Sequence, residues 1–312
     1  MTRLIADIGG TNARFALVDA AGAIGDERTL LVRDFPDPGS AIEAYLGDRR
    51  AEEAVIAVAT PVETEEIGFT NSPWRFTRGG LKTRLGLREL AVINDFAAQA
   101  LAMPHLASAE IELLGGGPAA PGRAAGVIGA GTGLGVSALV PGKAGWTALP
   151  TEGGHVSFAP GNEREDRVLA VLRGRLGHVS NERLLSGQGL LNLAQSLAAI
   201  DGRITEAGTA EEVTEAARRG SCPACVEAVT LFSTLLGSAA GDLALTVGAR
   251  GGIYVAGGVC LRLGSLFDRA AFRRRFVDKG RMRAYLEPIP TWLVLRGDTG
   301  LIGASHYRLA GD

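Results

Sequence analysis

Two glycine–threonine turns, each directly after an apolar run, constrain the fold of this 312-residue chain more than any other feature. The first is Asp7-Ile8-Gly9-Gly10-Thr11-Asn12, and the second, Gly129-Ala130-Gly131-Thr132-Gly133, follows about 120 residues later. Strand-like runs flank the turns, at 4–6 and 14–19 and again at 126–129 and 136–140. Too few residues join the first two runs for a crossover helix. They are therefore predicted to form an antiparallel hairpin and not the βαβ start of a Rossmann domain.

The two turns have the composition of phosphate-binding loops. Glycine lets backbone N–H groups approach anionic oxygens, and a threonine hydroxyl adds a donor. We expect both turns to hold the phosphates of a nucleotide, through Gly9, Gly10, Thr11, Asn12, Gly131, Thr132 and Gly133. Taken alone, either motif is equally compatible with a capped hairpin turn. A third glycine turn, Gly257-Gly258, follows the apolar run 252–256 and is also expected to contact the nucleotide.

Carboxylates at the ends of predicted strands supply the other groups that phosphoryl transfer to an alcohol needs. Asp7 directly precedes the first turn, where a carboxylate can orient a water bound to Mg²⁺, so it is the expected metal residue. Asp95 follows the apolar run 91–93 and is the expected general base for the attacking hydroxyl, with Asn94 hydrogen-bonding neighbouring substrate oxygens. The alternative is that Asn94 or Asp95 caps a helix over 96–102, and both roles are compatible.

The composition describes an ordinary globular protein, with 46% hydrophobic and 21% charged residues. A formal net charge of −2 creates no long-range field for nucleic acid or an anionic membrane, so small molecules are the expected partners. Three cysteines form no disulfide framework, and the N-terminus lacks the pattern of a signal peptide, so a cytoplasmic location is expected. We expect no membrane span, since the apolar runs fall short of roughly 20 residues.

The length predicts two lobes, and the second half becomes helical. The segment 181–200 predicts two helices joined by a tight link. Ser221 as N-cap, with Pro223 in the first turn, predicts a long helix that ends near Gly248. Residues 252–256 are expected to form a buried strand, 292–295 a last strand and 297–305 a terminal helix.

Six motifs resemble, in the same order, those of bacterial ATP-dependent glucokinases, and the match runs over nearly the whole chain. They are Asp7–Arg14, Ile93–Phe96, Gly129–Gly135, Glu152–His155, Glu182–Gly187 and Ala256–Gly258. Relatives grouped as repressor, open-reading-frame and kinase proteins carry a cysteine-rich zinc cluster after the Gly-His pair. This chain has Val156-Ser157-Phe158-Ala159-Pro160 there, which resembles the zinc-free branch.

The resemblance implies an α/β, two-lobed actin-like ATPase (ribonuclease H-like) fold with a hexose in the central cleft. The small lobe would be 1–105 completed by 296–312, and the large lobe 106–295. The implied reaction is transfer of the γ-phosphoryl of ATP, with Mg²⁺, to the 6-hydroxyl of D-glucose, in a homodimer.

Glu152, His155 and Glu182 carry the acceptors that a polyhydroxylated substrate demands. Glu152 and His155 flank a glycine pair, so both side chains could reach one site. The alternatives are a helix-dipole role for Glu182 and a structural loop role for His155.

Rival functions are a kinase for fructose, mannose or an amino sugar, and a non-catalytic sugar-responsive binding protein on the same fold. We expect no DNA-binding module, because the first turn begins six residues after Met1. An actin-like filament protein would lack the Glu/His set. Cys222-Pro223-Ala224-Cys225 is not expected to be a redox site, since no thioredoxin-like surround is evident, nor a zinc site, since Cys260 offers no second pair.

Overall fold

The two predicted strand–turn–strand motifs lie in two different sheets of the computed structural model, which describes residues 2–69, 72–143 and 145–309. β1 (Arg3–Ile8) pairs antiparallel with β2 (Asn12–Val18), and β9 (Ala125–Ala130) pairs antiparallel with β10 (Leu134–Gly142). Both motifs are therefore confirmed as hairpins, as the short connections require.

The two large sheets share one strand order. The first runs β3 (Ile24–Leu31), β2, β1, β4 (Glu53–Val58), β7 (Glu89–Asn94), and β1, β4 and β7 are parallel. The second runs β11 (Gly145–Thr151), β10, β9, β12 (Gly252–Ala256), β13 (Thr291–Val294), with β8 (Ile111–Gly115) antiparallel at its far edge. The repeat seen in the sequence thus extends to a repeated sheet. β5 (Glu66–Gly68) and β6 (Arg75–Thr77) pair separately.

The chain separates into two compact units. Residues 1–106, 146–150 and 296–312 form unit 1, and residues 107–145 and 151–295 form unit 2. Residues 310–312, which the sequence analysis places in the first lobe, lie outside the described residues.

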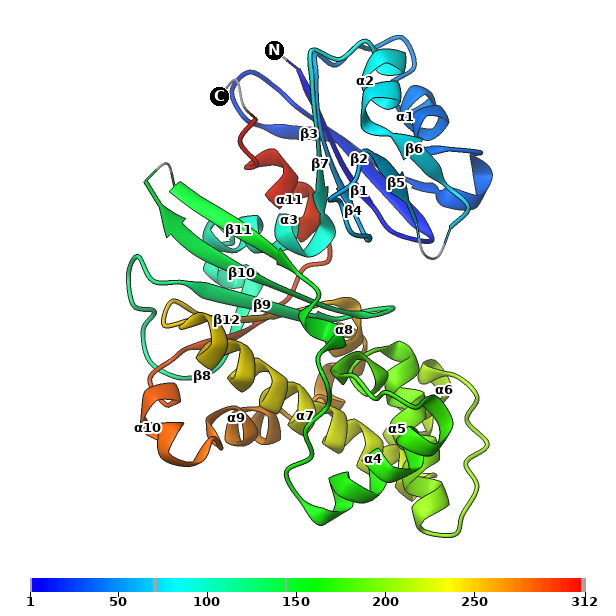
Figure 1. Cartoon of the computed structure of the whole chain (residues 1–312), viewed down its shortest axis with the longest axis vertical. Helices are drawn as coiled ribbons and strands as arrows, with labels where there is room; N and C mark the ends of the chain where they lie inside the picture. The colour runs from blue at the N-terminus through cyan, green and yellow to red at the C-terminus, as the bar shows by residue number, and fades with distance from the viewer. Residues whose placement is uncertain (1, 70–71, 144, 310–312) are drawn as a thin grey trace. The chain divides into compact units, whose positions relative to one another are not determined.

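Unit 1 is completed by a helix from the far end of the sequence. Its helices are α1 (Pro38–Leu46), α2 (Arg78–Leu85), α3 (Asp95–Ala102) and α11 (Thr299–Ser305). α11, drawn in red, lies beside α3 among the blue and cyan elements (Figure 1). A β-carbon at Gly303 would lie 1.6 Å from the Ala98 carbonyl oxygen, so only glycine allows these helices to approach this closely. Leu301 and Ala304 share an apolar cluster with Ile5 of β1.

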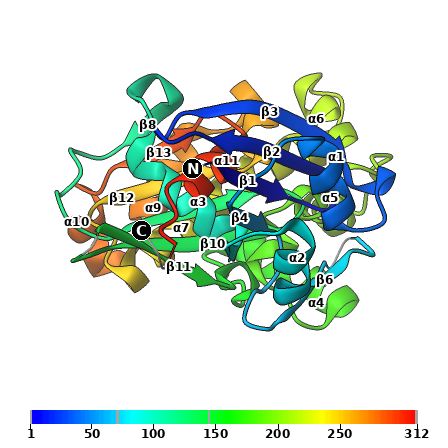
Figure 2. The same cartoon turned by 90° about the horizontal axis from the view of Figure 1, so that it is seen from above.

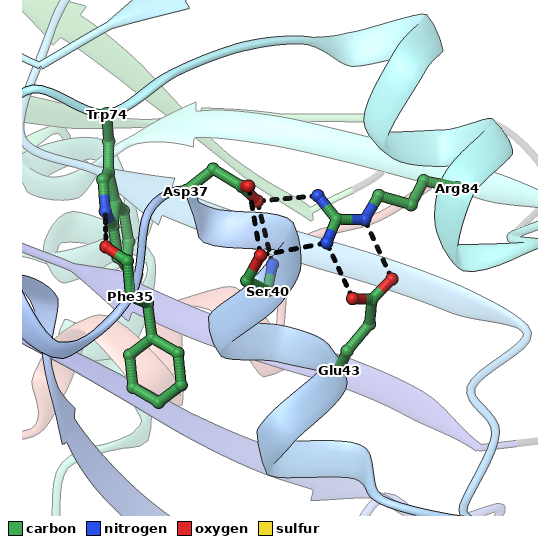
Figure 3. Close-up of polar contacts among 6 residues, drawn as sticks. All are labelled: Phe35, Asp37, Ser40, Glu43, Trp74 and Arg84. Atoms are coloured by element: carbon green, nitrogen blue, oxygen red, sulfur yellow. Dashed lines mark hydrogen bonds and ion pairs between the residues drawn. The ribbon is translucent and has the colours of Figure 1, made fainter.

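A four-residue polar cluster fastens α2 to α1. The Arg84 guanidinium donates to Asp37 at 2.8 Å, to Ser40 at 3.0 Å and to both carboxylate oxygens of Glu43 at 2.8 and 2.7 Å (Figure 3). Asp37 also caps α1 by accepting from the Ser40 backbone N–H. The planar guanidinium suits this forked geometry, and the cluster fixes the outer layer of unit 1.

Unit 2 is built around one long buried helix, α7 (Pro223–Val247). In Figures 1 and 2, α4, α5 and α6 lie toward one end of α7, and α9 and α10 lie toward the other. The other helices are α4 (Glu163–Leu176), α5 (Gly187–Ile200), α6 (Ala210–Arg218), α8 (Gly258–Leu263), α9 (Arg269–Val277) and α10 (Arg283–Leu286).

Two expectations for unit 2 are corrected by the structure. The N-cap of α7 is Cys222 and not Ser221, because the Cys222 sulfur accepts the Cys225 backbone N–H. The first of the two helices expected over 181–200 is only a 3₁₀ turn, Asn181–Arg183. Within the described residues, one helix, α7, has an 18-residue window that is long and apolar enough to cross a membrane. In that window 67% is buried inside the unit, as in a core helix.

Candidate active site

The first glycine turn joins β1 to β2 at an exposed corner of unit 1. The Gly9 backbone N–H donates to the Asn12 carbonyl at 2.9 Å and closes the turn. Gly10, Thr11 and Asn12 are solvent-exposed. The arrangement leaves an accessible loop of small and hydroxyl-bearing residues, as a phosphate site requires.

Asp7 lies on β1 just before this turn, with 18% of its side chain exposed. Burial raises the pKa of this carboxyl, while the Arg14 guanidinium, 3.3 Å from Oδ2, acts in the opposite direction. Gly300 of α11 closes over it, since a β-carbon there would lie 2.6 Å from Asp7 Cγ. No role for Arg14 or Gly300 was predicted from the sequence, although the small residues of segment 297–305 are a signal of close packing.

Asn94 and Asp95 stand where β7 passes into α3. Asn94 Oδ1 accepts from the backbone N–H groups of Phe96 and Ala97 at 2.9 and 3.1 Å, so it caps the helix. The capping alternative is therefore correct for Asn94, and it leaves the Asn94 amide hydrogens directed elsewhere. Asp95 is half-buried, and its Oδ1 accepts from the Phe96 N–H at 2.9 Å. Asp95 is the acidic residue in the first turn of α3, a position where the helix dipole favours negative charge.

Strand register brings these two groups of unit 1 to the same edge of the sheet. Ile8 is level with Val58, and Val58 is level with Asn94. The turn that starts at Gly9 and the Asn94-Asp95 pair therefore both leave the carboxyl ends of parallel strands. This edge is where α/β sheets bind ligands.

The second glycine turn is tied into unit 2 by backbone hydrogen bonds. The Gly131 N–H donates to the Gly133 carbonyl at 2.8 Å, and the Gly187 N–H donates to the Gly131 carbonyl at 2.9 Å. Thr132, at the tip of the turn, is exposed. The turn is thus held rigidly while its hydroxyl residue faces solvent.

Glu152, His155 and Glu182 form one row in unit 2. His155 Nε2 lies 3.9 Å from Glu152 Oε2, and His155 Nδ1 lies 4.0 Å from Glu182 Oε1. The side chains of Glu152 and His155 are 61% and 59% exposed, so they are open to a ligand. The Gly153-Gly154 pair between them packs on β10, and a β-carbon at Gly154 would lie 1.9 Å from the Leu134 carbonyl oxygen.

Glu182 links this row to the second turn. Its Oε2 accepts the backbone N–H of Leu134, the residue after the turn, at 2.9 Å. A β-carbon at Gly133 would lie 2.4 Å from the same oxygen, so glycine keeps the carboxylate close to the turn. Glu182 lies in the 3₁₀ turn Asn181–Arg183, so the helix-dipole alternative does not describe its contacts.

Gly257 and Gly258 stand at the end of β12, beside the second turn. Ala256 is level with Gly129 of β9. Gly257 has φ +89°, and a β-carbon there would lie 2.4 Å from the Ala130 carbonyl oxygen, so only glycine fits.

A cavity of about 230 Å³ opens next to this glycine pair. Its lining, which sequence reasoning missed, comes from α5, α6 and α8: Leu190, Ala210, Glu211, Thr214, Glu215, Arg218, Val259 and Arg262. The Thr209 N-cap and amphipathic 210–218 could have predicted α6, but not its position beside α8.

The residues fit a magnesium ion bound chiefly through phosphates and water. In the described part of the chain, no group of three or more His, Cys, Asp or Glu side chains could cage a metal. Mg²⁺ characteristically takes one or two carboxylates and completes its shell with substrate phosphates and waters. Asp7, a carboxylate directly before a phosphate-type turn, has the required chemistry.

The comparisons with known proteins identify the family. The glucokinase family model matches residues 4–310. A relative described as glucokinase from Chromobacterium violaceum is 48% identical over 98% of this chain and 88% of its own length. A glucokinase structure from an Antarctic psychrotroph has a TM-score of 0.88 at 37% identity, covering 98% of each chain. A ROK family glucokinase from Streptomyces griseus, solved with glucose and AMPPNP, shares the fold with a TM-score of 0.64 at 22% identity and 98% coverage of each chain. The two-lobed α/β kinase fold expected from the motifs is confirmed, and the chain belongs to the glucokinase family.

Proposed function

We propose that this chain transfers the γ-phosphoryl group of ATP to the 6-hydroxyl of D-glucose, giving glucose 6-phosphate and ADP. The observation that carries the proposal is the 2.9 Å hydrogen bond from the Leu134 N–H to Glu182, which joins the carboxylate–imidazole row to the second glycine turn. A site for hydroxyls and a site for phosphates are thereby coupled within one unit. Membership of the glucokinase family supports the same reaction.

ATP is the proposed donor, held at its phosphates by the two glycine–threonine turns. The residues proposed for these contacts are Gly9, Gly10, Thr11, Asn12, Gly131, Thr132 and Gly133. The 230 Å³ cavity beside Gly257 and Gly258 is the proposed nucleoside site. The AMPPNP bound to the Streptomyces griseus protein supports a nucleotide donor on this fold.

Asp95 is the proposed general base. A carboxylate can accept the proton of the attacking hydroxyl, and such general-base catalysis contributes about 10²- to 10⁴-fold. Because Asn94 Oδ1 is engaged in capping α3, its amide group is the part proposed to donate to sugar oxygens. Mg²⁺, which Asp7 would hold through a water, supplies neutralisation of the phosphate charge.

Glu152, His155 and Glu182 are proposed to bind the sugar hydroxyls. Their polar atoms lie 3.9 to 4.0 Å apart along the row, so adjacent hydroxyls of one sugar can contact neighbouring members. A site built on such bonds discriminates strongly against analogues that lack a hydroxyl. The row also lies next to the second glycine turn, which is proposed to bind phosphate. This proximity favours a kinase over a sugar-responsive binding protein.

The test is an assay of sugar-phosphate formation, read by mass spectrometry, across D-glucose, fructose, mannose and glucosamine, with ATP, ADP and polyphosphate as donors. We expect the highest kcat/KM with glucose and ATP, and loss of turnover in Asp95→Asn. A higher kcat/KM with another hexose would assign the chain to that sugar. Sugar binding without formation of a sugar phosphate from any donor would instead favour a binding protein.

We also propose that the chain works in the cytoplasm as a homodimer. The described cysteines Cys222, Cys225 and Cys260 are free thiols, which suits a reducing compartment. The dimer rests on the family resemblance, and light scattering coupled to size exclusion would give a monomer mass if it is wrong.

A further inference from the structure

Cys222 and Cys225, at the start of α7, have no role in the site described above. We propose that they form a reversible disulfide by exchange with low-molecular-weight disulfides, Cys222 acting as the attacking thiol. A redox role was not expected from the sequence, because the residues around a Cys-x-x-Cys motif decide its reactivity and no thioredoxin-like environment was evident. The structure shows the contacts of both sulfur atoms.

The two sulfurs face a common point. Thr205 Oγ1 lies 3.8 Å from Cys222 Sγ and 3.7 Å from Cys225 Sγ. The Cys225 backbone N–H donates to Cys222 Sγ at 3.3 Å, so the first sulfur sits on the open N-terminus of α7. A cysteine at the N-cap and a second one turn later is an arrangement that supports thiolate formation.

The two thiols differ in the way that exchange requires. Cys222 is half-buried, whereas Cys225 is fully buried. Partial burial acts against ionisation of Cys222, but hydrogen bonds from the Cys225 thiol and backbone outweigh it and lower its pKa. Burial raises the pKa of Cys225 to about 11. Cys222 is therefore the thiol that reacts first, and Cys225 is protected until the second step.

Cys260 provides an internal control in the same unit. It is fully buried, and burial raises the pKa of its thiol to about 12. The Cys260 thiol is therefore neither accessible to solvent nor readily ionised. The fold therefore predicts one reactive pair and one inert cysteine.

The exchange balances in two steps. The Cys222 thiolate attacks one sulfur of the small disulfide, forms a mixed disulfide and releases one small thiolate, which takes up a proton. Cys225 loses its proton to solvent and attacks Cys222 Sγ, forming the intramolecular disulfide and releasing the second small thiol. The cysteine pair gives up two electrons, and the small disulfide is reduced to two thiols.

The experiment treats the whole native chain with oxidised glutathione and reads the mass and the position of each modification by peptide mapping. Wild type should lose two hydrogens, keep no glutathione and fall from three free thiols to one, Cys260, with dithiothreitol restoring all three. Cys225→Ser should hold one glutathione on Cys222. Cys222→Ser should stay unmodified, and it should fold because serine is a favoured N-cap.

A urea-unfolded sample is the matched control, in which all three cysteines should react. If only Cys222 and Cys225 react in the native chain but all three cysteines react in the unfolded chain, the difference in reactivity is caused by the fold. The proposal is overturned if native wild type does not react, if glutathione persists on it, or if Cys222→Ser reacts as wild type does. None of these readouts uses kinase activity, so they stand apart from the proposed function.

Discussion

His105 and His306 stack face to face in unit 1, with ring centroids 3.4 Å apart and planes 3° from parallel. His105 ends the 3₁₀ turn that follows α3, and His306 is the C-cap of α11. The pair therefore joins the helix that begins at Asp95 to the helix that covers Asp7.

This stack predicts that stability falls in mild acid. Partial burial lowers the pKa of both rings, and the charge of His105 lowers that of His306 further. Below the usual histidine pKa of about 6.5, the unfolded chain then binds more protons than the folded chain, so unfolding is favoured as the pH drops. Urea unfolding between about pH 8 and pH 5 measures the effect. His105→Phe keeps an aromatic ring and should flatten the dependence, and an identical pH profile in that variant would contradict the assignment.

Asp95→Asn should lower kcat by roughly 10²-fold or more while leaving glucose affinity and melting temperature close to wild type. The amide can still hydrogen-bond a hydroxyl but cannot accept its proton, and Asn94 still caps α3. Asp34→Asn, at an exposed carboxylate of the same unit, is the control and should be neutral. Steady-state kinetics decide the matter, since a variant that keeps a tenth of wild-type kcat is incompatible with a general base.

Glu152→Gln and His155→Ala should weaken glucose binding, each by about 1–3 kcal/mol if the lost partner is buried by the sugar. Glu182→Ala should do so too and should also lower the melting temperature, because the Leu134 N–H loses its acceptor. Isothermal titration with glucose and thermal unfolding separate the two effects. Unchanged glucose affinity in all three variants would remove the row from the sugar site.

Gly300→Ala should destabilise unit 1 by about 1–3 kcal/mol and reduce activity, because the added β-carbon would lie 2.6 Å from Asp7 Cγ. Gly303→Ala should be worse, since its β-carbon would meet a backbone oxygen. Gly297→Ala is the matched control, with nothing within 4 Å of the new methyl group. In thermal unfolding, the melting temperature should be lowest for Gly303→Ala, intermediate for Gly300→Ala and close to wild type for Gly297→Ala. Equal melting temperatures would mean that α11 shifts to accommodate the added methyl group.

Thr132→Val should raise the KM for ATP or lower kcat without affecting glucose binding. Valine keeps the branched shape of this exposed residue and removes only the hydroxyl. Thr230→Val, on the exposed surface of α7, is the control for the substitution itself. A folded Thr132→Val enzyme with wild-type ATP kinetics would show that the turn is structural.

Local signals in the sequence predicted much of the fold. The hairpin β1–β2, the bounds of β12 and the end of α7 at Gly248 followed from apolar runs, glycine and proline. β3 gave no such signal, since half of its residues are polar and most of them are exposed, at the edge of the sheet. The terminal helix was predicted, but its contact with Asp7 depends on packing between segments almost 300 residues apart.

The candidate site shows the same division. Glycine turns and carboxylates at strand ends can be recognised from local sequence, so Asp7, Asp95 and Thr132 could be named as candidates from the sequence. The hydrogen bond between Glu182 and Leu134 and the lining of the cavity by α6 depend on which elements meet in three dimensions. These tertiary contacts cannot be read from the spacing of residues along the chain.

The position of α11 at the end of the sequence determines when unit 1 can finish folding during synthesis on the ribosome. β7, the last strand of the first sheet to be made, is finished at Asn94, whereas α11 is synthesised about 200 residues later. At 5–20 residues per second, that interval lasts roughly 10–40 s. Throughout it, Ile5, Val55 and Ala57 lack the cover that Leu301 and Ala304 later give. Unit 1 is begun first and finished last, so one apolar face of its sheet stays without its final cover until the end of synthesis.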